Sequence, residues 1–138
     1  MDNETSSYEI SNESLISWFE AEIKNGYAWI DELSQSEYLP QMLNLHNLDG
    51  ISFEKGCYLG QEIVARMQHR GKLKKTLHQG TASRQIENGE NLLSEDGRVL
   101  GKVVAAAKNK FLAVIQTKSL DTPQLQLEDG GTAEVSAQ

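Results

Sequence analysis

The stretch ISFEKGCYLGQEIVARM, residues 51–67, separates two parts of the chain that differ in hydrophobic pattern. It places the only cysteine, Cys57, between Gly56 and Gly60, ahead of a segment with helical apolar spacing, residues 61–69. Helical spacing also occurs before this stretch, whereas the spacing after it is that of strands. We therefore expect an α+β fold in which a glycine-rich loop carries the thiol and leads into a short helix.

Residues 12–25 are predicted to form an amphipathic helix, followed by a connector of mixed character, residues 27–50. Asn12 suits the N-cap and Gly26 the C-terminal stop. At about 100° per residue, four apolar side chains fall on one stripe, which we expect to face the core. They are Leu15, Ile16, Phe19 and Ile23. Trp18 lies at the flank of this stripe, a position that suits partly buried packing and also leaves one indole face open to a ligand.

From residue 72 onward the chain has the pattern of short strands. Apolar runs are separated by turn signals such as Asn88-Gly89, Asp96-Gly97 and Asp129-Gly130-Gly131. The expected strands cover residues 73–82, 98–107, 111–117, 124–127 and 132–135. Five or six short strands at this spacing favour a small closed barrel or a sandwich. We accordingly divide the chain into residues 1–71 and a β domain of residues 72–138.

Length and composition limit the class of protein. With 138 residues, 38% of them hydrophobic, and no apolar run of membrane-spanning length, the chain suits one or two small folded units. The polar, acidic start MDNETSSYEIS lacks the features of a secretory signal, so we expect a cytoplasmic location. One cysteine cannot by itself supply the three or four protein ligands of a zinc site or an iron–sulfur cluster. We expect no metal site, and any cluster chemistry would need other proteins.

The charge is distributed unevenly. The net charge is −7, yet no acidic residue lies between Ile63 and Ile86, where six of the 13 basic residues are found. Three of them, Arg66, Arg70 and Lys72, are candidates for an anion patch. The alternative is a solvated basic face that complements a helix C-terminus and continues onto an exposed strand.

The loop around Cys57 has features of a reactive thiol site. Backbone N–H groups converge where a loop enters a helix, and together with Lys55 they would favour the thiolate. Gly56 and Gly60 would permit the tight or left-handed backbone that such a loop needs. The alternative is an ordinary buried cysteine in a tight turn.

The run from Lys55 to Glu62, KGCYLGQE, resembles the K-G-C-Y-x-G-Q-E signature of the YgfZ family, relatives of the glycine-cleavage aminomethyltransferase. The flanking segments Leu39-Pro40-Gln41, Gly50-Ile51-Ser52-Phe53, Val64-Ala65-Arg66 and Arg70-Gly71 are also similar. The resemblance covers nearly the whole chain but corresponds only to the C-terminal portion of a family member. It implies an aminomethyltransferase-like arrangement, with part of a folate-binding domain followed by a C-terminal antiparallel β-barrel.

The resemblance implies binding of tetrahydrofolate or a derivative, and support of iron–sulfur cluster assembly or repair and of tRNA thiomethylation. The expected partners are iron–sulfur enzymes, including those that thiomethylate tRNA, and tRNA itself. Cys57 would be the functional thiol, with Lys55 beside it, and Trp18 aligns with a tryptophan that contacts folate in the family. The remaining signature residues are Gly56, Tyr58, Gly60, Gln61 and Glu62. Trp29 has no such counterpart and receives no role.

Three functions remain open on this basis. A folate-binding accessory factor is favoured over a turnover enzyme. A folate-dependent aminomethyltransferase shares the expected fold but lacks the cysteine signature. A non-catalytic barrel fragment that mediates interactions is the third, because half of a cleft rarely holds a small molecule well.

Overall fold

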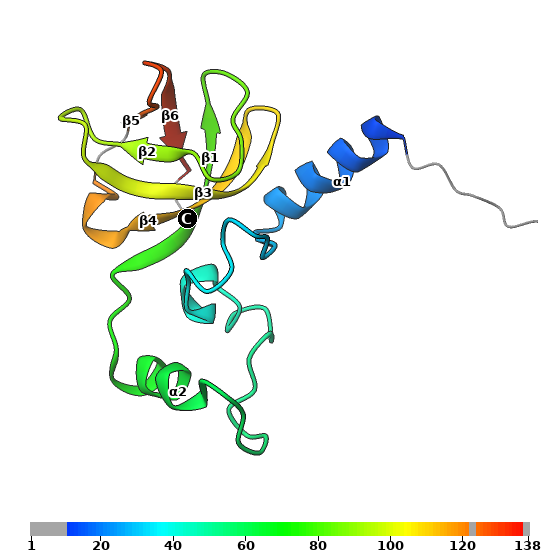
Figure 1. Ribbon diagram of the computed structural model, residues 1–138, viewed down its shortest axis with the longest axis vertical. Helices are drawn as coiled ribbons and strands as arrows, with labels where there is room; N and C mark the ends of the chain where they lie inside the picture. The colour runs from blue at the N-terminus through cyan, green and yellow to red at the C-terminus, as the bar shows by residue number, and fades with distance from the viewer. Residues whose placement is uncertain (1–10, 122–123, 137–138) are drawn as a thin grey trace, which may run out of the picture.

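The computed structural model describes residues 11–121 and 124–136. A barrel lies at one end of the molecule, and α2 (Gln61–Arg70) lies at the other end of its longest axis (Figure 1). The helix α1 (Asn12–Lys24) reaches the barrel with its C-terminal end only (Figure 1). Between α1 and α2 the chain forms turns and one short 3-10 helix, η1 (Pro40–Leu43).

Six antiparallel strands close into a barrel in the order β1-β4-β3-β2-β5-β6, with β6 paired to β1. Their bounds are β1 Lys75–Ala82, β2 Asn91–Leu93, β3 Val99–Ala107, β4 Lys110–Gln116, β5 Gln124–Gln126 and β6 Thr132–Val135. A short 3-10 helix, η2 (Thr117–Ser119), follows β4. The α+β class and the C-terminal antiparallel barrel are therefore confirmed, and the sandwich is not formed. The strand β2 was not predicted.

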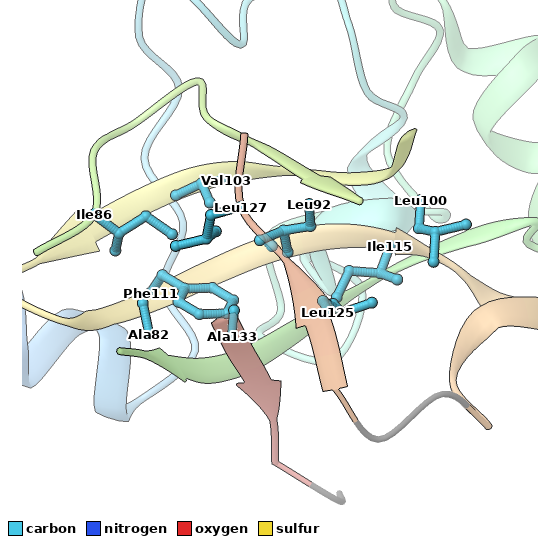
Figure 2. Close-up of a cluster of buried hydrophobic side chains, with 11 residues drawn as sticks. Ala82, Ile86, Leu92, Leu100, Val103, Phe111, Ile115, Leu125, Leu127 and Ala133 are labelled. Atoms are coloured by element: carbon cyan, nitrogen blue, oxygen red, sulfur yellow. The ribbon is translucent and has the colours of Figure 1, made fainter. Parts of the chain in front are cut away.

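Two groups of buried side chains form the core, one inside the barrel and one outside it. Phe111, Ala113 and Ile115 of β4 point into the barrel, where Figure 2 shows Phe111 and Ile115 among the labelled interior residues. Leu112 and Val114, on the opposite face of β4, belong to a second cluster with residues of α1 and η1. Burial on both faces explains why this strand reads as a continuous apolar run.

Gly80 allows β1 to pass close to its neighbours. It is paired with Phe111 on β4 and with Val135 on β6. A Cβ atom at this position would lie 2.4 Å from Cζ of Phe111 and 2.5 Å from the backbone oxygen of Glu134. The barrel therefore closes here only because residue 80 has no side chain.

The predicted helix α1 is confirmed, but its predicted core stripe is mostly not buried. Ile23 is 1% exposed, whereas Leu15, Ile16 and Phe19 are 38–41% exposed. Only the C-terminal end of α1 reaches the barrel (Figure 1). The apolar side chains nearer the N-terminus of α1 therefore remain partly exposed within the described residues. The N-cap is Ser11 rather than Asn12, because the Ser11 side chain accepts from the Ser14 N–H at 3.2 Å.

The helix α2 is also confirmed, and it is joined to η1 through a buried amide. Val64 is the buried residue of α2, whereas Ile63 is exposed. The side chain of Gln41 donates from Nε2 to the Val64 carbonyl at 2.7 Å. In the part of the chain that the structure describes, neither α1 nor α2 is long and apolar enough to cross a membrane.

Candidate functional site

A cavity of about 700 Å³ lies between α1 and the barrel. Aromatic side chains form one side of it, the small residues 105–107 of β3 form the floor, and the loop of residues 85–88 contributes a polar rim. The complete lining is Ile16, Trp18, Phe19, Trp29, Asp31, Gln85, Ile86, Glu87, Asn88, Val104, Ala105, Ala106, Ala107 and Lys108. The three residues of β3 that form the floor are all alanines.

The aromatic side combines three rings. The Trp18 centroid lies 5.0 Å from that of Phe19, in an edge-on arrangement, and 5.5 Å from that of Trp29. Trp29 is held in place by its indole N–H, which donates to Glu22 Oε2 at 3.2 Å. Trp18 is 44% exposed, close to the 38–41% of the three exposed stripe residues, so its exposure does not distinguish a flank position from the stripe. No role was predicted for Trp29, but it lines the same cavity as Trp18, so we include it in the candidate site.

The polar rim is ordered by Asp31. Its carboxylate accepts from the Ser34 hydroxyl at 2.7 Å and from Asn88 Nδ2 at 3.1 Å. The Ser34 hydrogen bond is the main cause that lowers the pKa of Asp31, and the Asn88 bond adds to it. Asp31 therefore stays ionised and tethers the loop of Asn88 to the segment after α1, so its own acceptor capacity is largely used.

The thiol of Cys57 is exposed, which contradicts the alternative of a buried cysteine. Gly60 is the N-cap of α2 with φ of +83°, so the expected left-handed backbone occurs there. Gly56 has no positive φ and nothing within 4 Å of a Cβ, so neither strain nor crowding requires glycine at that position. Lys55 Nζ lies 4.8 Å from the Tyr58 ring centroid, an arrangement typical of a cation–π contact.

The anion patch, Arg66, Arg70 and Lys72, is exposed. Arg66 is engaged by Glu62 of the signature at 2.5 Å, but both side chains face solvent and such pairs are weak. Gln61 begins α2 next to them. The patch thus remains accessible to an anion.

Arg84, the last basic residue of the acid-free segment, is paired with two carboxylates of the barrel loops. It forms ion pairs with Glu90 at 2.7 Å and with Asp129 at 2.5 Å. These pairs raise the pKa of Arg84 and lower the pKa of both carboxyl groups. Arg84 therefore joins the loop after β1 to the start of β2 and the β5–β6 turn and is not available to a ligand.

The structure does not bring Trp18 and Cys57 into one cavity. The aromatic cavity has no lining residue between positions 32 and 84, and the loop before α2 lies away from the barrel (Figure 1). Among the described residues there is no group of three or more His, Cys, Asp or Glu side chains that could hold a metal ion. The site consists of an aromatic cavity and a separate exposed thiol loop.

No family model matches the chain. Curated relatives do match it, among them the tRNA-modifying protein YgfZ of Serratia proteamaculans, 36% identical over 129 residues. That alignment covers 86% of this chain and 39% of the relative. The proteins of the same name from Hamiltonella defensa and Escherichia coli O45:K1 are each 45% identical over 96 residues, which is 66% of this chain and 29% of each relative. The chain thus spans well under half the length of these relatives.

Proposed function

The chain belongs to the YgfZ family, as a counterpart of its C-terminal portion, and on this premise we propose that it contributes to tRNA modification by binding a tetrahydrofolate-type ligand. The relatives carry the name tRNA-modifying protein, and the signature around Cys57 is the one that the resemblance rests on. The role is that of a cytoplasmic accessory factor that supports assembly or repair of iron–sulfur clusters.

The observation that carries the folate part of the proposal is the aromatic cavity. A pterin ring is flat, with apolar faces and a polar edge. The indoles of Trp18 and Trp29 supply surfaces for stacking. The side chains of residues 105–107 on the floor are small, so they would not block a ring. Gln85 and Glu87 on the rim offer hydrogen-bonding groups to the polar edge. The residues present therefore fit this ligand class.

The cavity residues of this chain are too few for tight binding. An aromatic pair contributes about 0.5–1.5 kcal/mol beyond area burial, whereas micromolar affinity requires about 8 kcal/mol. Both Trp18 and Trp29 are also about half exposed, so one side of a stacked ring would face solvent. The second wall of the site would come from the part of the longer relatives that lies outside this chain.

Cys57 is the proposed functional thiol. Because Cys57 lies outside the aromatic cavity, it would meet a cluster intermediate or a partner protein rather than a folate bound in that cavity. Its exposure supports contact with a partner, and the nearby anion patch supports contact with tRNA or a polyglutamate tail. The proposed partners are iron–sulfur enzymes, including those that thiomethylate tRNA.

A non-catalytic interaction module is the second candidate. It is favoured by the apolar side chains of α1 that are exposed within the described residues, Leu15, Ile16 and Phe19. Exposed apolar clusters of this kind mark interaction surfaces.

The proposal is tested in a full-length relative by replacing the residues equivalent to Cys57 and Trp18 with serine and alanine. Both variants should lose most of their support of thiomethylated tRNA nucleosides, measured by mass spectrometry of digested tRNA, at unchanged protein level. Full activity in both variants would contradict the proposed role and would leave the interaction module as the better account.

A further inference from the structure

Gln41 is a buried polar residue that the proposed function leaves unexplained. It is 2% exposed, and it lies in the segment Leu39-Pro40-Gln41 that resembles the lead-in to the family signature. Its Nε2 donates to the carbonyl of Val64 at 2.7 Å across 23 residues of sequence. Its Oε1 is buried without a hydrogen-bond partner in the described part of the chain. Burying an unpaired acceptor costs free energy, and an apolar side chain would avoid this cost. The presence of an amide here therefore points to a role for its N–H donor.

The bond acts on more than α2, because the thiol loop is attached to this helix. Phe53, ahead of the signature, contacts the ring of His69 on α2 with 6.5 Å between the centroids. At the start of α2, the Gln61 N–H donates to the Tyr58 carbonyl at 3.2 Å, and Gly60 accepts from two N–H groups of the first turn. The loop of residues 51–60 and α2 are therefore expected to move as one unit.

The other end of the bond is anchored in the barrel. Gln41 belongs to η1, whose Leu43 is 2% exposed and packs in the second core cluster with Leu77 of β1 and Leu112 of β4. Val64 is the buried residue of α2, so the contact between α2 and η1 is small and the amide of Gln41 lies within it.

We propose that Gln41 is a positioning residue, whose amide fixes α2 and the attached Cys57 loop in one orientation relative to the barrel and its aromatic cavity. An interior helical carbonyl such as that of Val64 already has an N–H partner four residues later in its own helix. The bond from Gln41 is therefore an additional tie that sets the direction of the helix, and it is not needed for the helix to form. The claim on orientation stands by itself, and its consequence for tRNA modification rests on the proposed function.

The chain offers a direct probe, because Cys57 is its only cysteine and is exposed. A nitroxide attached to Cys57 broadens the NMR signals of backbone amides near it, and the set of broadened amides reports the orientation of the thiol loop. In Gln41→Met, which keeps the length and removes the donor, this set should change or spread over more barrel amides. Exchange of the α2 amides should become about tenfold faster, as expected for one lost hydrogen bond. The midpoint of barrel unfolding should stay unchanged.

Gln68→Met is the matched control, since Gln68 is an exposed residue on the same helix. It should leave both the broadened amides and the α2 exchange rates as they are. An unchanged broadening pattern in Gln41→Met would overturn the inference. A change in the free energy of barrel unfolding as large as the change in the free energy of opening of α2 would overturn it as well. In a full-length relative, substitution of the equivalent glutamine by methionine should reduce tRNA thiomethylation at constant melting temperature. Full activity there would overturn the consequence for tRNA modification, whereas the broadening pattern decides the claim on orientation. Absence of folate binding would affect only the proposed function.

Discussion

A methyl group added at Gly80 tests how tightly the barrel closes around its core. In Gly80→Ala, the new Cβ would lie 2.4 Å from Cζ of Phe111 and 2.5 Å from the backbone oxygen of Glu134. Phe111 is fully buried in the barrel core, and the Glu134 oxygen belongs to the backbone of β6, so neither atom can move without disturbing the barrel. Overpacking of this kind costs about 1–3 kcal/mol. At about 4 °C per kcal/mol, Tm should fall by about 4–12 °C.

The assay is urea unfolding for the free energy and thermal unfolding for Tm, both followed by circular dichroism, with Gly56→Ala as the control. Gly56 has nothing within 4 Å of a Cβ and no positive φ, so its substitution should change stability by less than about 0.5 kcal/mol. If the clash with Phe111 causes the loss, adding Phe111→Leu to Gly80→Ala should cost at least about 0.5 kcal/mol less than the sum of the two single changes. Equal stability of Gly80→Ala and Gly56→Ala, or strict additivity in the double variant, would refute the reasoning.

Three further predictions concern the thiol loop and the charged groups. Cys57→Ser should change the free energy of unfolding by less than about 0.5 kcal/mol because the thiol is exposed, and a loss above about 2 kcal/mol in urea unfolding would mark a structural cysteine. Because Arg84 lowers the pKa of Glu90 and Asp129, the stability from both carboxylates is present above their ordinary pKa values of 4.5 and 3.8 and is lost as the pH falls through the lowered values. Arg84→Met should flatten this loss in acid unfolding curves, and an unchanged acid dependence would argue against the pairing. Substitution of all three residues of the anion patch by glutamate should weaken tRNA binding at low salt in filter-binding assays, and unaltered binding would favour a solvated basic face.

The sequence predicts most of the barrel because three of its turns are marked by glycine. Gly89, Gly97 and Gly130 all have positive φ, as the Asn-Gly and Asp-Gly pairs indicate. The strand β2 was missed because Asn91-Leu92-Leu93 shows no polar–apolar alternation, whereas the equally short β5, Gln124-Leu125-Gln126, does. It exists through its pairing with β3 and β5, which is a property of the closed barrel.

The helix α1 and the aromatic cavity show what a local pattern cannot supply. Periodicity identifies an apolar stripe on α1, but which element covers it depends on tertiary structure, and the described barrel covers only its end around Ile23. Trp29 enters the cavity because the chain turns back after α1 and the indole bonds to Glu22. The helical pattern carries no signal for this, although an aromatic residue shortly after an amphipathic helix was a hint.

The sequence also does not show which basic residues are paired with acids. Six basic residues without an acid suggested one basic segment, yet Arg84 is paired with Glu90, six residues later, and with Asp129 of the β5–β6 turn. The pair with Asp129 depends on the strand order of the barrel, which a single sequence does not reveal. The sequence left both an accessible and a buried Cys57 open, and the structure shows the thiol to be exposed.

Titration with tetrahydrofolate, followed by tryptophan fluorescence, tests the proposed ligand site most directly. The chain has two tryptophans, so in Trp29→Phe the signal comes from Trp18 alone. The 138-residue chain by itself should show weak or no saturable quenching, and adding the part of a longer relative that this chain does not cover should produce saturable quenching of Trp18. Trp18→Ala should then weaken the reconstituted binding, measured by calorimetry, more than Trp29→Phe does. Reconstituted binding that is indifferent to Trp18→Ala, or tight binding by the chain alone, would contradict a folate site completed at this aromatic cavity.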